Sequence, residues 1–479
     1  MERRTKILAT LGPASSNEAV LEQMLKAGIN VVRLNFSHGT HESHASSLSL
    51  VRQLSKRLNC PVMLLQDLQG PKIRIGEIEG GAIHLHKGQT LRLTNQVVIG
   101  NEQVVSVDLP ILTHVVDPGS RILIDDGNLE LKVRSVQEEY LETEVTLGGI
   151  LKSRKGVNLP GVPLDLPSLT EKDEEDLRFG LEQQIDAIAL SFVRSANDIR
   201  SLRAKLTDIS PDQAGIPIIA KLERPQALQN LDEIIEAADG VMVARGDLGV
   251  ELEPEAVPIV QKNIINAANQ AGKVVITATQ MLESMINNPR PTRAESSDVA
   301  NAIFDGTDAV MLSGETAIGK YPVASVEMMN AIICQAEQHM REWGHWKGPD
   351  APKSTGDDAY FVTLAARELA HDRNVAAIAV FTQSGRTALL MSKVRPSVPI
   401  LAFTPNLQTY KTLNLYWGVH PYLIPHAETI ECMIQLVEKA LLTLTPIQSG
   451  QQVVLICGFP VHTSRPANLA LLHTVGISR

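Results

Sequence analysis

The chain has 479 residues, with 44 lysines and arginines against 54 aspartates and glutamates, so its formal net charge is −10. The hydrophobic fraction of 44% excludes wholesale disorder, and a mildly acidic chain without long basic runs argues against nucleic-acid binding. At roughly 150 residues per domain, this length predicts about three domains.

Eight short aliphatic runs recur along the chain, each followed by polar residues and then by a helical pattern. The runs are residues 6–11, 31–36, 62–68, 187–193, 216–222, 240–244, 274–277 and 309–312. Helices are predicted over residues 17–27, 41–58, 170–183, 196–206, 225–237, 258–271 and 293–304. Alternating buried strands and helices predict an α/β fold, a (β/α)₈ TIM barrel. A doubly wound open sheet is the alternative.

Residues 71–167, after the third run, have a different residue pattern. They alternate Val, Ile, Leu and Thr with polar residues and contain recurrent glycines, which predicts an inserted all-β domain. The insertion divides the barrel into residues 1–70 and 168–342. Because loops that follow barrel strands surround the active site, we expect this domain to close over the site as a lid.

The end of the chain predicts a separate domain. A helix over residues 322–341 is followed by a glycine- and proline-rich linker at 343–358. Residues 343–479 are predicted to form a C-terminal α/β domain. Its predicted helices are 359–371, 387–394 and 430–442, and its predicted strands are 376–381, 399–404 and 452–457.

The sequence carries few signals for secretion or membrane insertion. The four cysteines contain no Cys-x-x-Cys pair, and four cysteines in this length form no disulfide framework. No apolar run approaches the roughly 18 residues that a membrane helix needs. We therefore expect a cytoplasmic protein with no membrane partner.

Polar residues follow six of the eight predicted strands. They are Arg33, Asn35, Ser37 and His38; Asp67; Lys221 and Glu223; Arg245 and Asp247; Thr277, Thr279 and Gln280; and Ser313 and Glu315. Since the carboxyl ends of barrel strands meet at one mouth, we expect these side chains to form a single site.

Two carboxylates in this set come from adjacent strands. Glu223 and Asp247 suit Mg²⁺, with Mn²⁺ possible, because these ions prefer oxygen ligands and keep places for water and substrate. Lys221 points to the same face as Glu223, where an ammonium stabilises a transferring phosphoryl group or an enolate. The alternatives are an exposed pair of acids and a lysine that simply pairs with Glu223.

Several motifs in this order resemble the pyruvate kinase family over essentially the whole chain. They are residues 33–39 (RLNFSHG), 67–74 (DLQGPKIR), 156–161 (GVNLPG), 221–224 (KLER), 242–251 (MVARGDLGVE), 277–283 (TATQMLE), 291–295 (PTRAE) and 311–315 (MLSGE). The resemblance implies phosphoryl transfer from phosphoenolpyruvate to ADP, followed by protonation of the enolate to pyruvate.

The resemblance also implies residue roles. The implied catalytic residues are Lys221, Arg33, Arg74, Thr279 and Ser313, with Glu315 behind Ser313; the metal ligands are Glu223 and Asp247; the substrate-binding residues are Lys221, Gly246, Asp247 and Thr279; and the nucleotide-side residues are Asn35, His38, Arg74, Lys172 and Asp165. A second Mg²⁺ is implied to arrive with ADP. The family is usually a homotetramer.

The monovalent-cation site departs from a common form of the family. Many members bind K⁺ through Asn and Ser on strand two and Asp and Thr on strand three, with a Glu shortly after. Asn35, Ser37 and Asp67 are present, but Leu68 lacks the hydroxyl and Lys72 replaces the Glu. The sequence resembles the K⁺-independent form, and we expect the Lys72 ammonium to supply the missing charge. The alternative is a solvated hinge lysine.

A loop in the C-terminal domain resembles the family's effector site. It contains Thr382, Ser384, Gly385, Arg386 and Thr387, where hydroxyls and N–H groups at a predicted helix start favour phosphate. Residues 458–468, with His462, Ser464 and Arg465, are its expected second wall. A sugar phosphate or AMP is the expected effector; the alternative is a plain capping loop.

Two other functions are compatible with parts of this pattern. A Mg²⁺-dependent aldolase or lyase acting on pyruvate shares the Glu–Asp pair but needs neither the lid nor Lys172. A metabolite-sensing scaffold without catalysis predicts loss of Lys221, Glu223, Asp247 or Thr279, and all four are intact.

Overall fold

The computed structural model describes residues 3–162, 166–345 and 358–476. Eight parallel strands close into a barrel in the order β1-β16-β15-β14-β13-β12-β3-β2. The strands are β1 (Lys6–Thr10), β2 (Val31–Asn35), β3 (Met63–Asp67), β12 (Ala187–Leu190), β13 (Ile218–Leu222), β14 (Gly240–Ala244), β15 (Val274–Ala278) and β16 (Ala309–Leu312). They coincide with the eight predicted runs, so the predicted barrel is confirmed and the open sheet is wrong.

Helices cover the outside of the barrel. They are α1 (Glu18–Ala27), α2 (His41–Leu58), α4 (Glu171–Glu182), α5 (Ala196–Ile209), α6 (Pro225–Gln229), α7 (Leu231–Ala237), α8 (Arg245–Glu251), α9 (Val257–Gln270), α10 (Arg293–Asp305), α11 (Gly314–Ala317), α12 (Pro322–Gln338) and α13 (Met340–Trp343). Side-chain caps begin several of them, since the Thr170 hydroxyl accepts the Asp173 N–H and the Thr292 hydroxyl accepts the Glu295 N–H. The predicted helix at 225–237 is divided at Asn230, whose φ and ψ of −107° and 22° lie outside the helical range.

The amino-terminal ends of the strands form the floor of the barrel, opposite the mouth. The same kind of hydrogen bond recurs there before every second strand. A side-chain oxygen just before a strand accepts an N–H at the start of the preceding barrel strand. The pairs are Asn30 with Ile7 at 3.0 Å, Asp186 with Leu64 at 2.9 Å, Asp239 with Ile218 at 2.9 Å and Asp308 with Val275 at 2.8 Å. These bonds satisfy backbone N–H groups, and two of the acceptors, Asp186 and Asp308, are buried carboxylates on the face opposite the mouth.

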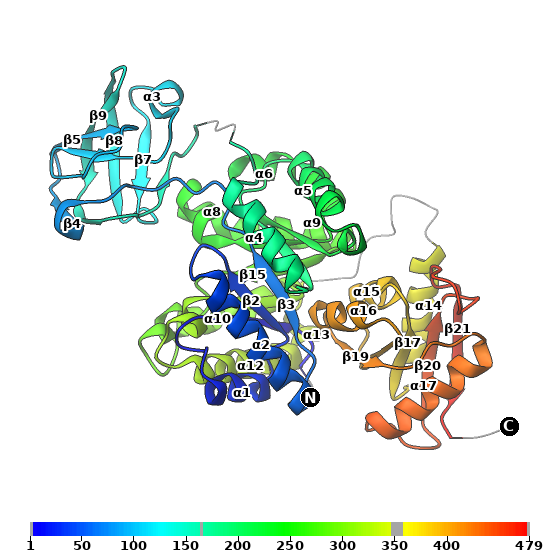
Figure 1. Cartoon of the computed structure of the whole chain (residues 1–479). Helices are drawn as coiled ribbons and strands as arrows, with labels where there is room; N and C mark the ends of the chain where they lie inside the picture. Colours follow the sequence, from blue (N-terminus) through cyan, green and yellow to red (C-terminus); the bar gives the residue numbers. More distant parts are fainter. Residues whose placement is uncertain (1–2, 163–165, 346–357, 477–479) are drawn as a thin grey trace.

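A β-rich unit lies between β3 and α4, and Figure 1 shows it projecting from the barrel on the side away from the C-terminal unit. Its strands are β4 (Ala82–Leu85), β5 (Thr90–Thr94), β6 (Val104–Ser106), β7 (Arg121–Ile124), β8 (Leu129–Val136), β9 (Tyr140–Leu147), β10 (Gly149–Lys152) and β11 (Val157–Asn158), with one short helix, α3 (Leu112–Val115). They form a six-stranded sheet, β11-β7-β8-β9-β5-β6, and a β10-β4 pair. A separate aliphatic core fills this unit.

The C-terminal unit is a five-stranded sheet in the order β19-β18-β17-β20-β21, with only β21 antiparallel to its neighbour. Its elements are α14 (Asp358–Asp372), β17 (Ala377–Phe381), α15 (Arg386–Lys393), β18 (Ile400–Thr404), α16 (Leu407–Thr412), β19 (Val419–Leu423), α17 (Ile430–Leu444), β20 (Gln452–Cys457) and β21 (Leu469–Thr474). The predicted linker before it lies largely outside the described residues. Among the helices of the described ranges, none combines the length and apolarity needed to cross a bilayer.

Candidate active site

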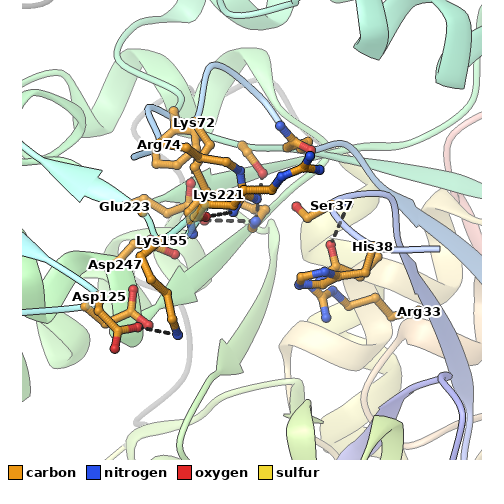
Figure 2. Close-up of a pocket in the computed structure, with 17 residues that line it drawn as sticks. Arg33, Ser37, His38, Lys72, Arg74, Asp125, Lys155, Lys221, Glu223 and Asp247 are labelled. Atoms are coloured by element: carbon orange, nitrogen blue, oxygen red, sulfur yellow. Dashed lines mark hydrogen bonds and ion pairs between the residues drawn. The ribbon is translucent and has the colours of Figure 1, made fainter. Parts of the chain in front are cut away.

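A cavity of about 270 Å³ lies at the mouth of the barrel, where the β-rich unit faces the carboxyl ends of the strands. It is lined by Arg33, Asn35, Ser37, His38, Gln69, Lys72, Arg74, Asp125, Asp126, Arg154, Lys155, Gly156, Ser191, Phe192, Lys221, Glu223 and Asp247. Figure 2 shows these side chains gathered from both units. The structure therefore brings together nine of the sequence-predicted residues in one cavity.

A buried network of charges supports the cavity from below. The Asp67 carboxylate accepts Arg33 Nε at 2.6 Å and lies 3.2 Å from Lys221 Nζ. Lys221 Nζ also contacts Glu223 Oε1 at 2.8 Å and donates to the Ser191 hydroxyl at 2.7 Å. Burial opposes ionisation of Asp67, but Lys221 and Arg33 outweigh it and hold the pKa of Asp67 below its usual value. Asp67, expected at a monovalent-cation site, is thus the counterion of Arg33 and Lys221.

Glu223 and Asp247 form the candidate metal pair. Glu223 is 1% exposed, and its Oε2 accepts the Phe192 N–H at 2.8 Å. Burial raises the pKa of Glu223, and the neighbouring Asp247 raises it further, against the attraction of Lys221. Two mutually repelling carboxylates at a cavity wall fit a divalent cation, because the cation would relieve that repulsion. The described residues contain no group of three or more potential metal-binding side chains.

Thr279 and Ser313 lie at the ends of the neighbouring strands β15 and β16, outside the set that lines the cavity. The Thr279 hydroxyl accepts the Gly246 N–H at 2.7 Å and donates to the Ala278 carbonyl at 2.6 Å. Ser313 Oγ is buried and has no hydrogen-bond partner among the described residues. A buried hydroxyl in this state marks a place for a water or a substrate atom.

Glu315 is a fully buried carboxylate behind Ser313. Its two oxygens accept the Ser313 N–H at 2.7 Å and the Leu282 N–H at 2.9 Å. Both bonds are to backbone, so Glu315 fixes the segment that carries Ser313 rather than facing the cavity.

The nucleotide-side residues are only partly together. Asn35, His38 and Arg74 line the cavity, whereas Lys172 Nζ pairs with Asp176 at 2.5 Å and donates to the Phe36 carbonyl at 2.9 Å. Burial lowers the pKa of His38, and the nearby Arg74, Lys72 and Arg33 lower it further, which favours the neutral imidazole. Asp165 lies outside the described residues.

Comparison with known proteins identifies the family. The sequence model of the pyruvate kinase barrel domain matches residues 2–326, and that of the pyruvate kinase alpha/beta domain matches residues 361–473. The chain belongs to the pyruvate kinase family. It is 46% identical to a pyruvate kinase of Geobacillus stearothermophilus over 99% of this chain and 81% of the relative. It is 48% identical to pyruvate kinase 2 of Synechocystis sp. over 88% of this chain and 71% of the relative.

Four charged residues of the barrel-mouth cavity were not identified by the sequence analysis. Asp125, Asp126, Arg154 and Lys155 come from the β-rich unit, and Lys155 Nζ pairs with Asp125 at 2.6 Å. Asp125 and Asp126 both have φ of 55° in the turn between β7 and β8. The Asp-Asp-Gly-Asn sequence predicts such a turn, but its position opposite the barrel mouth depends on the tertiary structure.

Residues of the loop that resembles the family's effector site line two different cavities. Thr382, Ser384 and Thr387 line a small cavity with Gly458, Thr463, Ser464 and Arg465 from the expected second wall. Gly385, with φ of 86°, is the N-cap residue just before α15, and its N–H donates to the Thr382 hydroxyl at 3.0 Å. The side chain of Arg386 instead lines a cavity between the C-terminal unit and the barrel floor. His462 is not among the residues that line either cavity.

Proposed function

We propose that this protein is a Mg²⁺-dependent pyruvate kinase (a phosphotransferase, EC 2.7.1.40) that transfers the phosphoryl group of phosphoenolpyruvate to ADP, the last step of glycolysis. The proposal rests chiefly on one observation: Lys221, Glu223 and Asp247 share a barrel-mouth cavity with Arg33 and Arg74. Two carboxylates for a cation, three fixed positive charges and a flanking unit match the needs of phosphoryl transfer.

Positive charge is concentrated where the phosphoryl group would pass. Asp67 holds Arg33 and Lys221 from the buried side, so neither needs to reorganise when negative charge develops in the cavity. Arg74 comes from the segment after β3, and its Nη1 donates to the Arg154 carbonyl of the β-rich unit at 3.1 Å. Arg33, Lys221 and Arg74 therefore orient the phosphate between the two units.

The divalent ion is proposed to bind Glu223 and Asp247. When bound, Mg²⁺ or Mn²⁺ would neutralise charge on the phosphate and the enolate. Glu223 Oε1 lies 2.8 Å from Lys221 Nζ, so a bound cation would share this carboxylate with the ammonium.

The second half of the reaction needs a proton at C3 of the enolate. The Thr279 hydroxyl is proposed to stand at the proton-delivery end through water, with the Ser313 hydroxyl behind it. Gly246, the Asp247 backbone and the Thr279 hydroxyl belong to the proposed pocket for the substrate carboxylate. Asn35, His38, Lys172 and Asp165 are proposed for the nucleotide side, and the β-rich unit is proposed to exclude water as a lid.

Several finer properties belong to the same proposal. Lys72 lines the cavity with Asn35 and Ser37, which supports activity without a K⁺ requirement. The hydroxyl-lined cavity at Thr382, Ser384 and Thr387 supports activation by a phosphorylated metabolite, a sugar phosphate or AMP. A homotetramer in the cytoplasm is the assembly and location we propose.

The test is pyruvate and ATP formation from phosphoenolpyruvate, ADP and Mg²⁺ in tetramethylammonium buffer, repeated with K⁺. Full activity without K⁺ supports the kinase and the role of Lys72; activity only with K⁺ retains the kinase and overturns that role. Unchanged kinetics across a panel of phosphorylated metabolites would reject the effector. Cleavage of a pyruvate aldol without ADP, and no kinase activity, would favour the aldolase or lyase.

A further inference from the structure

The guanidinium of Arg245 lies beneath the turn that ends β15. Arg245 is the first residue of α8, two residues before Asp247, and its side chain is 10% exposed. It does not line the barrel-mouth cavity. None of the catalytic, metal-binding, substrate-binding or nucleotide-side roles in the proposed function uses this buried charge.

The guanidinium forms hydrogen bonds with the turn on one side and with two helices on the other. Nη2 donates to the Thr279 carbonyl at 2.7 Å, and Nε donates to the same oxygen at 3.2 Å and to the Ala278 carbonyl at 3.3 Å. On its other side, Nη1 contacts Asp298 of α10 at 2.6 Å and Gln261 of α9 at 3.3 Å. Arg245 therefore ties the end of β15 to the helical layer.

The turn that Arg245 holds has an unfavourable backbone conformation. Thr279 and Gln280 have φ of 67° and 54°, in the left-handed region. This region is unfavourable for an L-residue because Cβ comes too close to a backbone carbonyl oxygen, and a β-branched residue such as threonine rarely occupies it. Such strain persists only where surrounding contacts maintain it, and the bonds from Arg245 to two carbonyls of the turn are contacts of that kind.

We propose that Arg245 is a positioning residue for protonation of the enolate. It keeps the β15 turn left-handed, and so keeps the Thr279 hydroxyl at 2.7 Å from the Gly246 N–H. In that step the enolate carbon takes a proton from the Thr279 side through water, the C2–O⁻ becomes the ketone, and solvent restores the proton. This inference rests on the proposed function, because it concerns one step of that reaction.

This role predicts that Arg245 affects the two halves of the reaction, phosphoryl transfer and protonation, to different extents. Without the guanidinium, the Thr279 carbonyl loses its donors and the turn is free to relax, which moves the hydroxyl. Lys221 is on β13 and Glu223 directly follows it, and neither receives a hydrogen bond from Arg245 in the described structure. Loss of Arg245 should therefore slow protonation more than phosphoryl transfer, and enolate released into water would still become pyruvate.

The experiment compares Arg245→Gln and Arg245→Lys with the intact protein. Exchange of the C3 hydrogens of pyruvate with D₂O, followed by NMR with Mg²⁺ and ATP present, reports the proton step. ATP formation from phosphoenolpyruvate and ADP reports phosphoryl transfer. We expect Arg245→Gln to lower exchange about tenfold more than ATP formation, which corresponds to about 1.4 kcal/mol, with Arg245→Lys intermediate.

Arg203→Gln is the matched control. Arg203 also ties loop carbonyls, those of Ala214 and Ile216, to a carboxylate, Asp239, but at the barrel floor. Its ratio of exchange to ATP formation should equal that of the intact protein. Should Arg245→Gln not fold, Asp298→Asn weakens the same anchor and should lower the ratio about threefold.

An unchanged ratio in the Arg245 variants, or in Asp298→Asn where it replaces them, would overturn the inference. Absence of ATP formation by the intact protein would overturn the proposed function instead. A merely structural role predicts that exchange and ATP formation fall together, as the melting temperature does.

Discussion

Lys72 places a positive charge beside a carboxylate of the candidate metal pair. Its Nζ lies 3.9 Å from Asp247 Oδ1, and its side chain is 28% exposed in the cavity. We predict that Lys72→Glu makes activity depend on K⁺, with activation of about tenfold or more, because a cation must then neutralise the added carboxylate. The measurement is turnover at saturating substrates in tetramethylammonium and potassium buffers.

Lys152→Glu provides the control for this prediction, since Lys152 is an exposed residue of the same β-rich unit. It reverses a charge in the same way away from the cavity, and its turnover should respond to K⁺ as the intact protein does. Equal activity of Lys72→Glu in the two buffers would contradict the prediction.

Asp67 is the buried counterion of Arg33 and Lys221. It is 1% exposed and holds two cations, so Asp67→Asn would leave Arg33 and Lys221 without their shared counterion. Removal of one partner from a buried ion pair costs about 3–5 kcal/mol, and we predict a loss of that order in the free energy of unfolding. Urea denaturation measures this loss, and Glu22→Gln, which breaks a surface ion pair, is the control. Equal denaturation midpoints for Asp67→Asn and the intact protein would refute the prediction.

At the level of elements, α4 packs closely on the barrel through Gly180. A Cβ added there would lie 2.1 Å from Gln66 Oε1, and Gln66 is held because its Nε2 donates to the Asp176 carbonyl at 2.6 Å. Gly180→Ala gains about 1 kcal/mol of helix propensity but meets an overpacking cost of about 1–3 kcal/mol.

We therefore expect Gly180→Ala to lower the free energy of unfolding in urea denaturation, although alanine is the better helix former. Gly215→Ala is the control, since no atom lies within 4 Å of its added Cβ. A stabilised Gly180→Ala would show that Gln66 moves aside without loss.

The elements also show where pattern reasoning succeeds. The barrel strands are buried on both faces and therefore appear as uninterrupted aliphatic runs, which the sequence displays directly. The edge strands β19 and β21 were missed: β19 contains Pro421, and both strands include partly exposed residues. The sequence does not predict α8, because its seven residues are too few to show a helical pattern.

At the scale of the whole molecule, the carboxylates of the barrel floor hold the C-terminal unit. Asp308 pairs with Lys393 and lies 2.7 Å from Arg395, and Asp186 lies 3.0 Å from Lys411. Burial lowers the pKa of Lys393 to about 8, although Asp308 opposes the shift. These contacts join two units that are far apart in the chain.

The lowered pKa predicts how stability changes with pH. Because the folded value of about 8 lies below the ordinary 10.5 of an unfolded chain, the unfolded state binds more protons between these values. The Lys393 contribution to the free energy of unfolding therefore rises from pH 8 to pH 10.5. Calorimetric melting over this range should show a smaller rise for Lys393→Met.

Lys411→Met is the comparison variant, because Lys411 also pairs across the boundary but is 26% exposed. We expect its pH dependence to remain close to that of the intact protein. Identical slopes for Lys393→Met and the intact protein would contradict the prediction.

Local sequence was enough to predict the eight strands, the positions of most helices and the residues at the strand ends. The reason is that aliphatic runs and helical patterns alternate in the sequence itself. It also predicted a β-rich insertion. Closure of the barrel then brings the strand ends together whatever the loops contain, so Arg33, Lys221, Glu223 and Asp247 were found without coordinates.

The tertiary structure decided the partners of those residues. Contacts between distant segments determine that Asp67 pairs with Arg33 and Lys221, that Asp125 and Lys155 line the cavity at the mouth, and that Arg386 lines a cavity between the C-terminal unit and the barrel floor. Arg245 is the clearest example, since its guanidinium acts on carbonyls of a strand end more than thirty residues away. Such hydrogen bonds depend on three-dimensional proximity, which no local pattern of residue types encodes.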